Sequence, residues 1–233
     1  MSNSYKHLFF DLDHTLWDFE KNAHDCLLEI YVHFDLKSLG VEDVLLFCEK
    51  FSEANHYYWA LLERKEITAD ELRRRRFKTA FAKLNVHIEE ALGLEMNAVF
   101  LQNLPSKKAL IEGAVDILDY LKPNYQLHIL SNGYQGLQIQ KMQSSAIHHY
   151  FEEIITVDKA KALKPAKAIF EYALKCTNAS VSNSLMIGDN YEADIKGAIN
   201  ANFDTVFYNP ARQKTVEKPT FDILKLIEIK QFL

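Results

Sequence analysis

Cysteine and long apolar runs are both scarce in this chain of 233 residues. The three cysteines, Cys26, Cys48 and Cys176, fit neither a disulfide framework nor a zinc site, and they suit a reducing compartment. No stretch approaches the ~20 consecutive apolar residues that a membrane-spanning helix needs. The apolar run Leu8–Phe10 stops at Asp11, so we expect no signal peptide, no membrane partner and a cytoplasmic location.

A large excess of charge is also missing, because 27 basic and 32 acidic residues give a net charge of −5. This mild acidic balance argues against a nucleic-acid polymer as partner, since such binding needs a dominant basic surface. The apolar share of 48% is typical of a globular protein with one large domain or two modest ones. Glycine is rare as well, with seven residues, and no glycine-rich turn follows a predicted strand, which excludes an NAD site.

Short apolar runs that end in polar residues predict the strands of a parallel sheet, because buried parallel strands are apolar throughout. Helical stripes between the runs indicate βαβ units, so the sequence predicts a Rossmann-like α/β fold. Ligands bind such sheets at the carboxyl ends of the strands. The expected strands lie at residues 6–10, 126–130, 184–187 and 204–208, with a weaker candidate at 153–157.

The segment from about residue 19 to residue 104 carries helical stripes and no convincing strand. Thr68 and Glu71 predict a capping box at the start of one helix. We therefore expect an all-helical insertion at 17–105, placed as a lid on a catalytic core made of 1–16 and 106–233. Stripes in the core predict further helices around residues 114–121 and 169–174, and a C-terminal helix from about Ile223 to Ile229.

Acidic side chains follow two of the predicted strands. Asp11 and Asp13 come after the first, and Asp189 and Asp194 come after the run at 184–187. An Asx-type turn explains the first pair equally well, and a helix N-terminus alone explains Asp194. Together, however, four carboxylates at one sheet edge form an oxygen-rich site that suits Mg²⁺.

Two further segments offer groups for an anion. The run Ser131–Gly133 follows a strand and supplies a hydroxyl and backbone N–H groups, although Ser131 could equally be a simple helix N-cap. Lys164 precedes Pro165, which suits a first helical turn and leaves the lysine in the loop. A lone lysine is usually solvated, but four carboxylates and one lysine sum to −3. A phosphate dianion then needs a divalent cation to enter.

These four motifs, in this order and spacing, resemble those of the haloacid dehalogenase (HAD) superfamily, and the helical segment resembles its type I cap. The resemblance implies that Asp11 is the nucleophile that forms an aspartyl-phosphate, and that Asp13 is the general acid and base. It implies a Mg²⁺ site made of Asp11, Asp189 and the Asp13 backbone carbonyl, with Asp194 holding a metal-bound water or orienting Lys164. It also implies phosphoryl binding by Ser131, Asn132, Gly133 and Lys164.

The acid at position 13 is similar to that of the superfamily's phosphatases and mutases, so the resemblance implies hydrolysis of a phosphate monoester. Within the superfamily the chain resembles the YjjG/YfnB-type 5′-nucleotidases, which act on nucleoside monophosphates, often pyrimidine ones. Alternatives are a phosphatase for phosphoglycolate or a sugar phosphate, a phosphomutase, and a non-enzymatic phospho-receiver module. The resemblance to the nucleotidases rests on residues 9–17, Ile67-Thr68, Arg76-Phe77, 131–134 with Gln138, and Tyr150-Phe151.

Arg76 is the one arginine of the run Arg73–Arg76 that falls on an apolar helical stripe. We expect it to point into the crevice between cap and core and to contact a small phosphorylated metabolite. An arginine that lays its stem along the stripe and keeps its charge in water is the alternative. The sequence gives no indication of the oligomeric state.

Overall fold

The computed structural model describes residues 5–233 and divides the chain into two compact units. One contains the described residues up to Phe19 together with Lys108–Leu233, and the other contains Glu20–Lys107. The borders expected from the sequence, after residue 16 and after residue 105, lie slightly N-terminal to these. The first is called the α/β unit below and the second the helical unit.

The α/β unit is built on a six-stranded sheet in which every neighbouring pair is parallel, in the order β3-β2-β1-β4-β5-β6. This confirms the predicted fold class and all five expected strands, including the weaker candidate. The three-residue edge strand β6 was not predicted. The strands are β1 (His7–Phe10), β2 (Gln126–Ser131), β3 (Phe151–Thr156), β4 (Ser184–Gly188), β5 (Asp204–Tyr208) and β6 (Phe221–Ile223).

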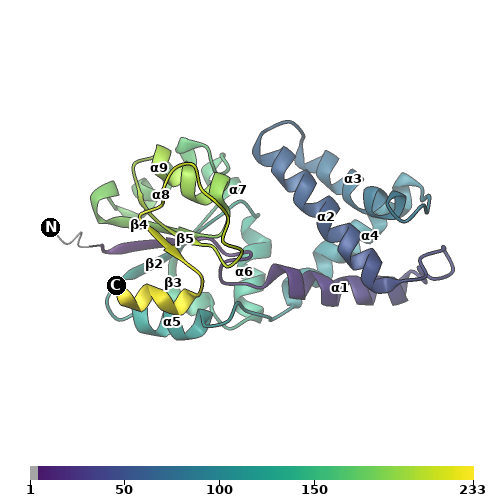
Figure 1. The fold of residues 1–233 in the computed structure, drawn as a ribbon, viewed down its shortest axis with the longest axis horizontal. Helices are drawn as coiled ribbons and strands as arrows, with labels where there is room; N and C mark the ends of the chain where they lie inside the picture. The colour runs from purple at the N-terminus through teal and green to yellow at the C-terminus, as the bar shows by residue number, and fades with distance from the viewer. Residues whose placement is uncertain (1–4) are drawn as a thin grey trace. The chain divides into compact units, whose positions relative to one another are not determined.

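Helices cover both faces of this sheet, with α8 and α9 on one side and α5 with the C-terminal segment on the other (Figure 1). On the first side, Phe9 and Met186 of the central strands pack with Phe170 and Phe203 in one buried cluster. The helices of the unit are α5 (Ala114–Leu121), α6 (Gln135–Ser144), α7 (Val157–Ala160), α8 (Lys167–Thr177) and α9 (Gly197–Asn200). A π-helical segment, Tyr191–Lys196, leads directly into α9.

The predicted C-terminal helix is only partly correct. Ile223 belongs to β6, and the helical part is a short 3₁₀ segment, Leu226–Gln231. Leu226 and Ile229 are buried, as their apolar character predicts. The apolar residues that predicted one helix therefore belong to an edge strand and to a separate short helical segment.

The helical unit consists of four α-helices and a short 3₁₀ segment, Leu104–Ser106, and contains no strand within Glu20–Lys107, as predicted. Buried aromatic rings fill its centre, with the Phe51 ring 4.7 Å from Phe77 and 5.0 Å from Phe100. The Thr68 side chain accepts a hydrogen bond from the Glu71 backbone N–H, and the Glu71 carboxylate accepts one from the Thr68 backbone N–H. The predicted capping box is therefore present. The helices are α1 (Phe19–His33), α2 (Val44–Glu63), α3 (Ala69–Ala82) and α4 (Glu90–Asn103).

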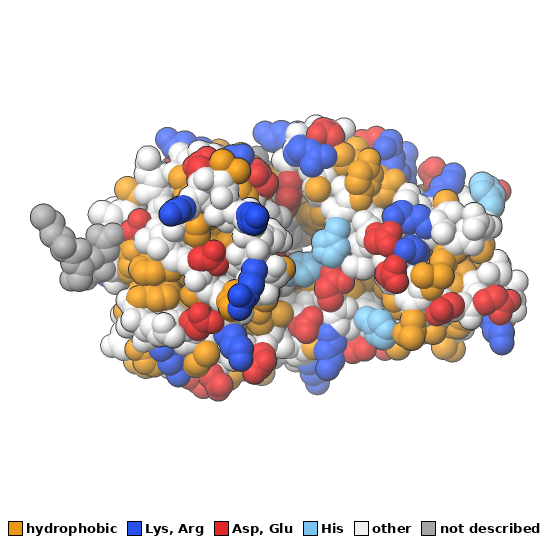
Figure 2. All heavy atoms as spheres, in the orientation of Figure 1, with side chains coloured by type: hydrophobic (Ala, Val, Ile, Leu, Met, Phe, Trp, Pro, Cys, Tyr) orange, Lys and Arg blue, Asp and Glu red, His pale blue; other side chains and the backbone are white. Residues whose placement is uncertain are grey.

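The surface agrees with the mild net charge. Acidic and basic side chains are interspersed on the face of each unit in Figure 2, without a continuous basic area on that face. All three cysteines are free thiols. Among residues 5–233, no helix combines the length and the apolar character that crossing a bilayer demands.

Candidate active site

The acidic pairs lie at the carboxyl ends of two neighbouring strands. Phe10 of β1 is in register with Ile187 of β4, and the Asp11 backbone N–H donates to the Ile187 carbonyl at 2.8 Å. Asp11 therefore leaves β1 beside the point where Asp189 leaves β4. The parallel pairing predicted from the sequence explains this convergence of residues that are distant in the chain.

Three carboxylates meet at this edge. Asp11, Asp189 and Asp194 each offer an oxygen, and these oxygens lie within 4.8 Å of one another. Gly188 makes the approach of Asp194 possible, because a Cβ at this position would lie 2.2 Å from the Asp194 Oδ2 atom. The Asn190 backbone N–H donates to the same oxygen at 3.0 Å and fixes it. The segment 188–194 thus folds around one carboxylate.

Lys164 is the cation of this cluster and is 1% exposed. Its Nζ atom lies 2.5 Å from Asp11 Oδ1 and 2.6 Å from Asp194 Oδ1, and it donates to the Leu130 carbonyl at 2.7 Å. Burial alone would lower the pKa of Lys164, but the two carboxylates raise it above its usual value. The alternative of a solvated lysine is therefore wrong, and Lys164 is a fixed positive charge.

The lysine loop was predicted correctly, but the position of its proline was not. Helix α8 begins at Lys167, so Pro165 precedes the helix and does not occupy its first turn. The Lys164-Pro165 peptide bond is cis.

The charge of the cluster provides a test of whether a metal ion fits. Three carboxylates and one lysine sum to −2. Burial, with Asp194 and Asp13 adding repulsion against the pull of Lys164, raises the pKa of Asp11 to about 7. Burial together with Asp11 and Asp194 raises the pKa of Asp189 well above its usual value. Such crowding of oxygen donors fits a hard divalent cation such as Mg²⁺.

Asp13 does not join this cluster, in contrast to the expected convergence of four carboxylates. Its carboxylate oxygens lie 2.6 and 2.9 Å from the Lys141 Nζ atom, and the Gln138 amide donates to it at 2.9 Å. Burial alone would raise the pKa of Asp13, but Lys141 and Gln138 lower it below its usual value. Lys141 therefore balances the charge of Asp13. The sequence predicted four carboxylates and one lysine with a net charge of −3, and with Lys141 included the net charge of the site is −2.

The Ser131–Gly133 segment ends β2 and faces the same edge. The Asn132 side chain accepts from the Lys164 backbone N–H at 2.7 Å and donates to the Lys164 carbonyl at 3.0 Å, so it ties this segment to the lysine loop. Helix α6 has Tyr134 as its N-cap residue, and Ser131 is 2% exposed within β2. The alternative of Ser131 as a simple N-cap is therefore wrong.

Comparison with known protein families agrees with this arrangement. A family model described as haloacid dehalogenase-like hydrolase matches residues 5–202, a range that includes all of the acids and both lysines described above. The chain belongs to the haloacid dehalogenase-like hydrolases. It is therefore a hydrolase.

Individual members of the haloacid dehalogenase-like family match over almost the whole chain. The pyrimidine 5′-nucleotidase PynA of Streptococcus pneumoniae is 32% identical over 94% of this chain and 91% of its own. The pyrimidine 5′-nucleotidase YjjG of Escherichia coli is 28% identical over 97% of this chain and 96% of its own. The solved structure of YfnB from Bacillus subtilis, described as bound to magnesium, superposes with a TM-score of 0.85 at 26% identity and covers 97% of both chains.

Arg76 lies inside the helical unit and is 3% exposed. Its Nε donates to Asn97 Oδ1 at 2.8 Å and its Nη1 to Asn55 Oδ1 at 3.1 Å, while the guanidinium lies 4.8 Å from the Phe100 ring centre. Burial, with Arg73 adding repulsion, lowers the pKa of Arg76 to about 9. The snorkelling alternative is wrong, because the charged end is buried. Contact with a substrate stays a prediction.

Three residues of this haloacid dehalogenase-like site were given no role from the sequence, although Thr15 and Gln138 are among the residues that carry the resemblance to the nucleotidases. Thr15 donates its hydroxyl to Asp189 Oδ1 at 2.8 Å, and Gln138 and Lys141 hold Asp13. One signal was available, because Gln138 and Lys141 lie three positions apart on the helix that follows the serine motif. They share the buried side of that helix with Met142.

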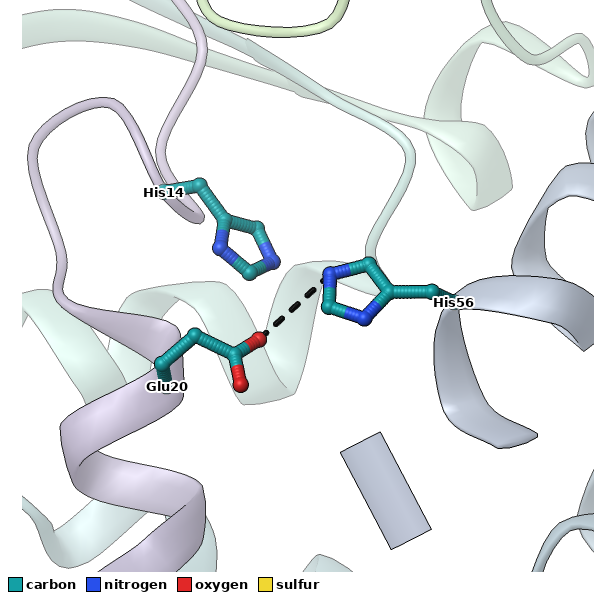
Figure 3. Close-up of side chains that lie close together, drawn as sticks. All are labelled: His14, Glu20 and His56. Carbon is teal, nitrogen blue, oxygen red and sulfur yellow. Dashed lines mark ion pairs between the residues drawn. The ribbon is translucent and has the colours of Figure 1, made fainter. Parts of the chain in front are cut away.

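The helical unit also contains an exposed pair of titratable side chains, Glu20 of α1 and His56 of α2 (Figure 3). Their Oε1 and Nε2 atoms lie 3.4 Å apart, and the other ring nitrogen of His56 contacts the Ser52 carbonyl at 2.9 Å. The first contact joins α1 to α2 and the second lies within α2, so we assign the pair no catalytic role.

Proposed function

We propose that this chain is a Mg²⁺-dependent phosphate monoester hydrolase that works through an aspartyl-phosphate on Asp11. The observation that carries the proposal is the meeting of Asp11, Asp189 and Asp194 around the buried Lys164. Mg²⁺ would be held by the Asp11 and Asp189 carboxylates and the Asp13 backbone carbonyl, and it would offset charge on the phosphoryl group. The 2.6 Å contact of Asp194 with Lys164 supports a role for Asp194 in orienting that lysine.

The side chains then divide the chemistry into two displacements at phosphorus. Asp11 attacks the phosphorus atom, and the bond to the leaving alkoxide breaks as Asp13 gives that oxygen a proton. Asp13 is a carboxylate in the free site, and it takes up this proton from solvent as the phosphate dianion binds beside it. Asp13, now a carboxylate, takes a proton from a water molecule that attacks the aspartyl-phosphate and releases phosphate and free Asp11. Lys164, the Ser131 hydroxyl and the backbone N–H groups of Asn132 and Gly133 offset charge on the phosphoryl oxygens throughout.

We infer that the substrate is a nucleoside monophosphate, preferably one with a pyrimidine base. Two relatives that match over more than nine-tenths of the chain, PynA and YjjG, carry the name pyrimidine 5′-nucleotidase, which supports this choice. Phosphoglycolate and sugar phosphates are the competing substrates. A phosphomutase would return the phosphoryl group to the substrate and release no free phosphate.

A phosphate-release screen tests the function. Purified protein is assayed on pyrimidine and purine nucleoside monophosphates, sugar phosphates and phosphoglycolate, each with Mg²⁺ and with EDTA. We expect release that needs Mg²⁺ and is fastest on a pyrimidine nucleotide, and we expect Asp11→Asn to abolish it. Asp116→Asn on α5 is the matched control. Release that persists in EDTA or in Asp11→Asn, or no release from any monoester, contradicts the proposal.

The proposal gives Arg76 a place in substrate recognition. Within residues 5–233 its Nη2 atom has no hydrogen-bond partner, and the residues bonded to its other nitrogens are neutral amides. A buried guanidinium with a donor to spare suits an anionic or carbonyl acceptor. We expect Arg76→Ala to lose more kcat/KM on a nucleotide than on a generic aryl phosphate. An equal loss on both substrates, or none, removes Arg76 from recognition.

The proposal also makes the helical unit a cap that opens to admit substrate and closes to exclude water. The solved structure of YfnB is described as revealing interdomain movement, which supports a moving cap in this chain. The connections at residues 14–18 and 103–106 would be the hinges. Spin labels on the two units should show more than one distance, with the populations changed by Mg²⁺ and a phosphate analogue. A single distance between the labels that does not change with Mg²⁺ or the phosphate analogue contradicts the proposal of a moving cap.

A further inference from the structure

Helix α6 carries two polar side chains that the reaction scheme above does not use. Gln138 is 1% exposed and Lys141 is 6% exposed, and both direct their polar ends toward the site. Residues three apart on a helix lie on the same side, so one face of α6 presents both groups together. Burying an amide and an ammonium is costly unless their hydrogen bonds are satisfied. The Lys141 ammonium and the Gln138 NH₂ group both have partners, whereas the Gln138 Oε1 atom has none among residues 5–233.

Lys141 binds the carboxylate of Asp13 through both oxygens, at 2.6 and 2.9 Å. Its ammonium also lies 4.6 Å from the centre of the Trp17 ring, whose Nε1 donates to Ser145 Oγ at 3.0 Å. The ammonium is thus fixed from two sides. A cation that contacts both carboxylate oxygens fixes where each of them lies.

Gln138 binds Asp13 and Ser131 with a single NH₂ group. It donates to Asp13 Oδ2 at 2.9 Å and to Ser131 Oγ at 2.6 Å. The reverse orientation of the amide would turn its oxygen toward a carboxylate, so the donors must face the site. Gly133 makes this approach possible, because a Cβ there would lie 2.5 Å from the Gln138 Cδ atom.

The bonds to Ser131 determine which way its hydroxyl points. Ser131 Oγ accepts from Gln138 and also from the Gly133 backbone N–H at 3.1 Å. A hydroxyl has two acceptor positions and one hydrogen. With both acceptor positions filled, Ser131 can only donate, which is the role that a phosphoryl oxygen requires of it.

We propose that Gln138 and Lys141 are positioning residues that hold the Asp13 carboxylate in place and fix the Ser131 hydroxyl as a hydrogen-bond donor. The inference rests on the proposed function, because it concerns the groups that transfer protons and bind phosphate in that scheme. Neither residue needs to touch the substrate. Lys141 acts through Asp13, and Gln138 acts through Asp13 and Ser131.

The test compares two leaving groups. An alkyl monoester such as a nucleotide needs a proton from Asp13, whereas an aryl phosphate with a good leaving group needs little help. Lys141→Met keeps the apolar stem beside Trp17 and removes the ammonium. We expect a loss of about 10²-fold in kcat/KM on the nucleotide and a much smaller loss on the aryl phosphate. Gln140→Leu, on the exposed side of α6, is the control and should behave as wild type.

A double-mutant comparison identifies the route of the effect. In the Asp13→Asn background we expect Lys141→Met to cause no further loss, because the group through which Lys141 acts is already gone. Gln138→Leu should raise KM and weaken inhibition by inorganic phosphate, because the Ser131 hydroxyl loses its fixed direction. If Lys141→Met does not fold, Lys141→Arg keeps the charge, moves it, and should show the same preference for the aryl substrate.

Each contrary result has a definite meaning. Equal losses on both substrates, a further loss in the Asp13→Asn background, or variants that match Gln140→Leu overturn this inference while the proposed function stands. A wild-type protein that hydrolyses no monoester overturns the proposed function, and this inference falls with it.

Discussion

In the α/β unit, Lys164 and Lys141 are buried against carboxylates, whereas in the helical unit Arg76 is buried against the amide oxygens of Asn55 and Asn97 and against aromatic rings. The pKa of Lys164 is raised by its acidic neighbours, while that of Arg76 is lowered by burial to about 9. The carboxylates at the sheet edge outnumber the two lysines that contact them. In the helical unit, no carboxylate is bonded to the buried Arg76. Each unit thus keeps unbalanced charge in its interior, of opposite sign.

Removing the lysine of the α/β unit should have the largest effect on stability. Lys164→Met leaves Asp11 and Asp194 buried without their cation, and breaking a buried ion pair from one side typically costs about 3–5 kcal/mol. We expect a loss of this size in urea unfolding, measured in EDTA. Lys167→Met removes an exposed pair with Glu171 and should cost less than about 1 kcal/mol. Equal small losses would mean that Lys164 is not the counter-ion of the cluster.

Removing the arginine of the helical unit should cost less. Arg76→Met takes a donor from Asn55 and from Asn97, and unsatisfied buried acceptors cost about 1–3 kcal/mol. The cost of burying a charge disappears at the same time and offsets part of this loss. We expect urea unfolding to show a smaller loss than for Lys164→Met, and exposed Arg75→Met to show little change. A larger loss for Arg76→Met than for Lys164→Met would contradict the expectation that the acidic cluster depends more strongly on its cation than the helical unit does.

His128 of the α/β unit is a buried base that, like Arg76, has no carboxylate as a hydrogen-bond partner in the described part of the chain. It therefore shows what burial does to the pKa of a base without an acid beside it. Burial, with His7 and Lys122 adding repulsion, lowers its pKa from 6.5 to about 3. The unfolded chain then binds more protons than the folded one between these pH values, so stability falls as the pH is lowered from 6.5. The slope contributed by His128 is at most about 1.4 kcal/mol per pH unit.

Urea unfolding at several pH values between 5 and 7 measures this effect. We expect His128→Gln to lose stability less steeply with falling pH than wild type does. His87→Gln, at an exposed position of the helical unit, should keep the wild-type slope. A slope unchanged in His128→Gln would show that the folded protein protonates this histidine normally.

Much of the fold could be predicted because strands and helices left local signals. Apolar runs that stop at an acid marked β1 and β4, and the pair Thr68 and Glu71 marked the start of α3. The three-residue strand β6 was missed because it exists only through pairing with β5, which no local pattern reports.

The acidic residues of the site could be predicted from the sequence, but most of their hydrogen-bond partners could not. Lys141 meets Asp13 across 128 positions of the chain, and a lysine on a helix is usually solvated. The role of Asn132 as a tie to the Lys164 backbone depends on a loop conformation that spacing does not encode. Convergence at a sheet edge follows from topology, whereas hydrogen-bond partners follow from packing.

The most direct measurement looks for phosphate on Asp11 itself. Wild-type protein turning over its best monoester in Mg²⁺ is quenched in acid, digested and analysed by mass spectrometry, with Asp13→Asn and an aryl phosphate as a second sample. We predict one phosphoryl group on the peptide that contains Asp11, labile to hydroxylamine, and more of it in the variant, which lacks the base for hydrolysis. Turnover with an unmodified Asp11 peptide in both samples, or a phosphoryl group on another residue, would contradict it.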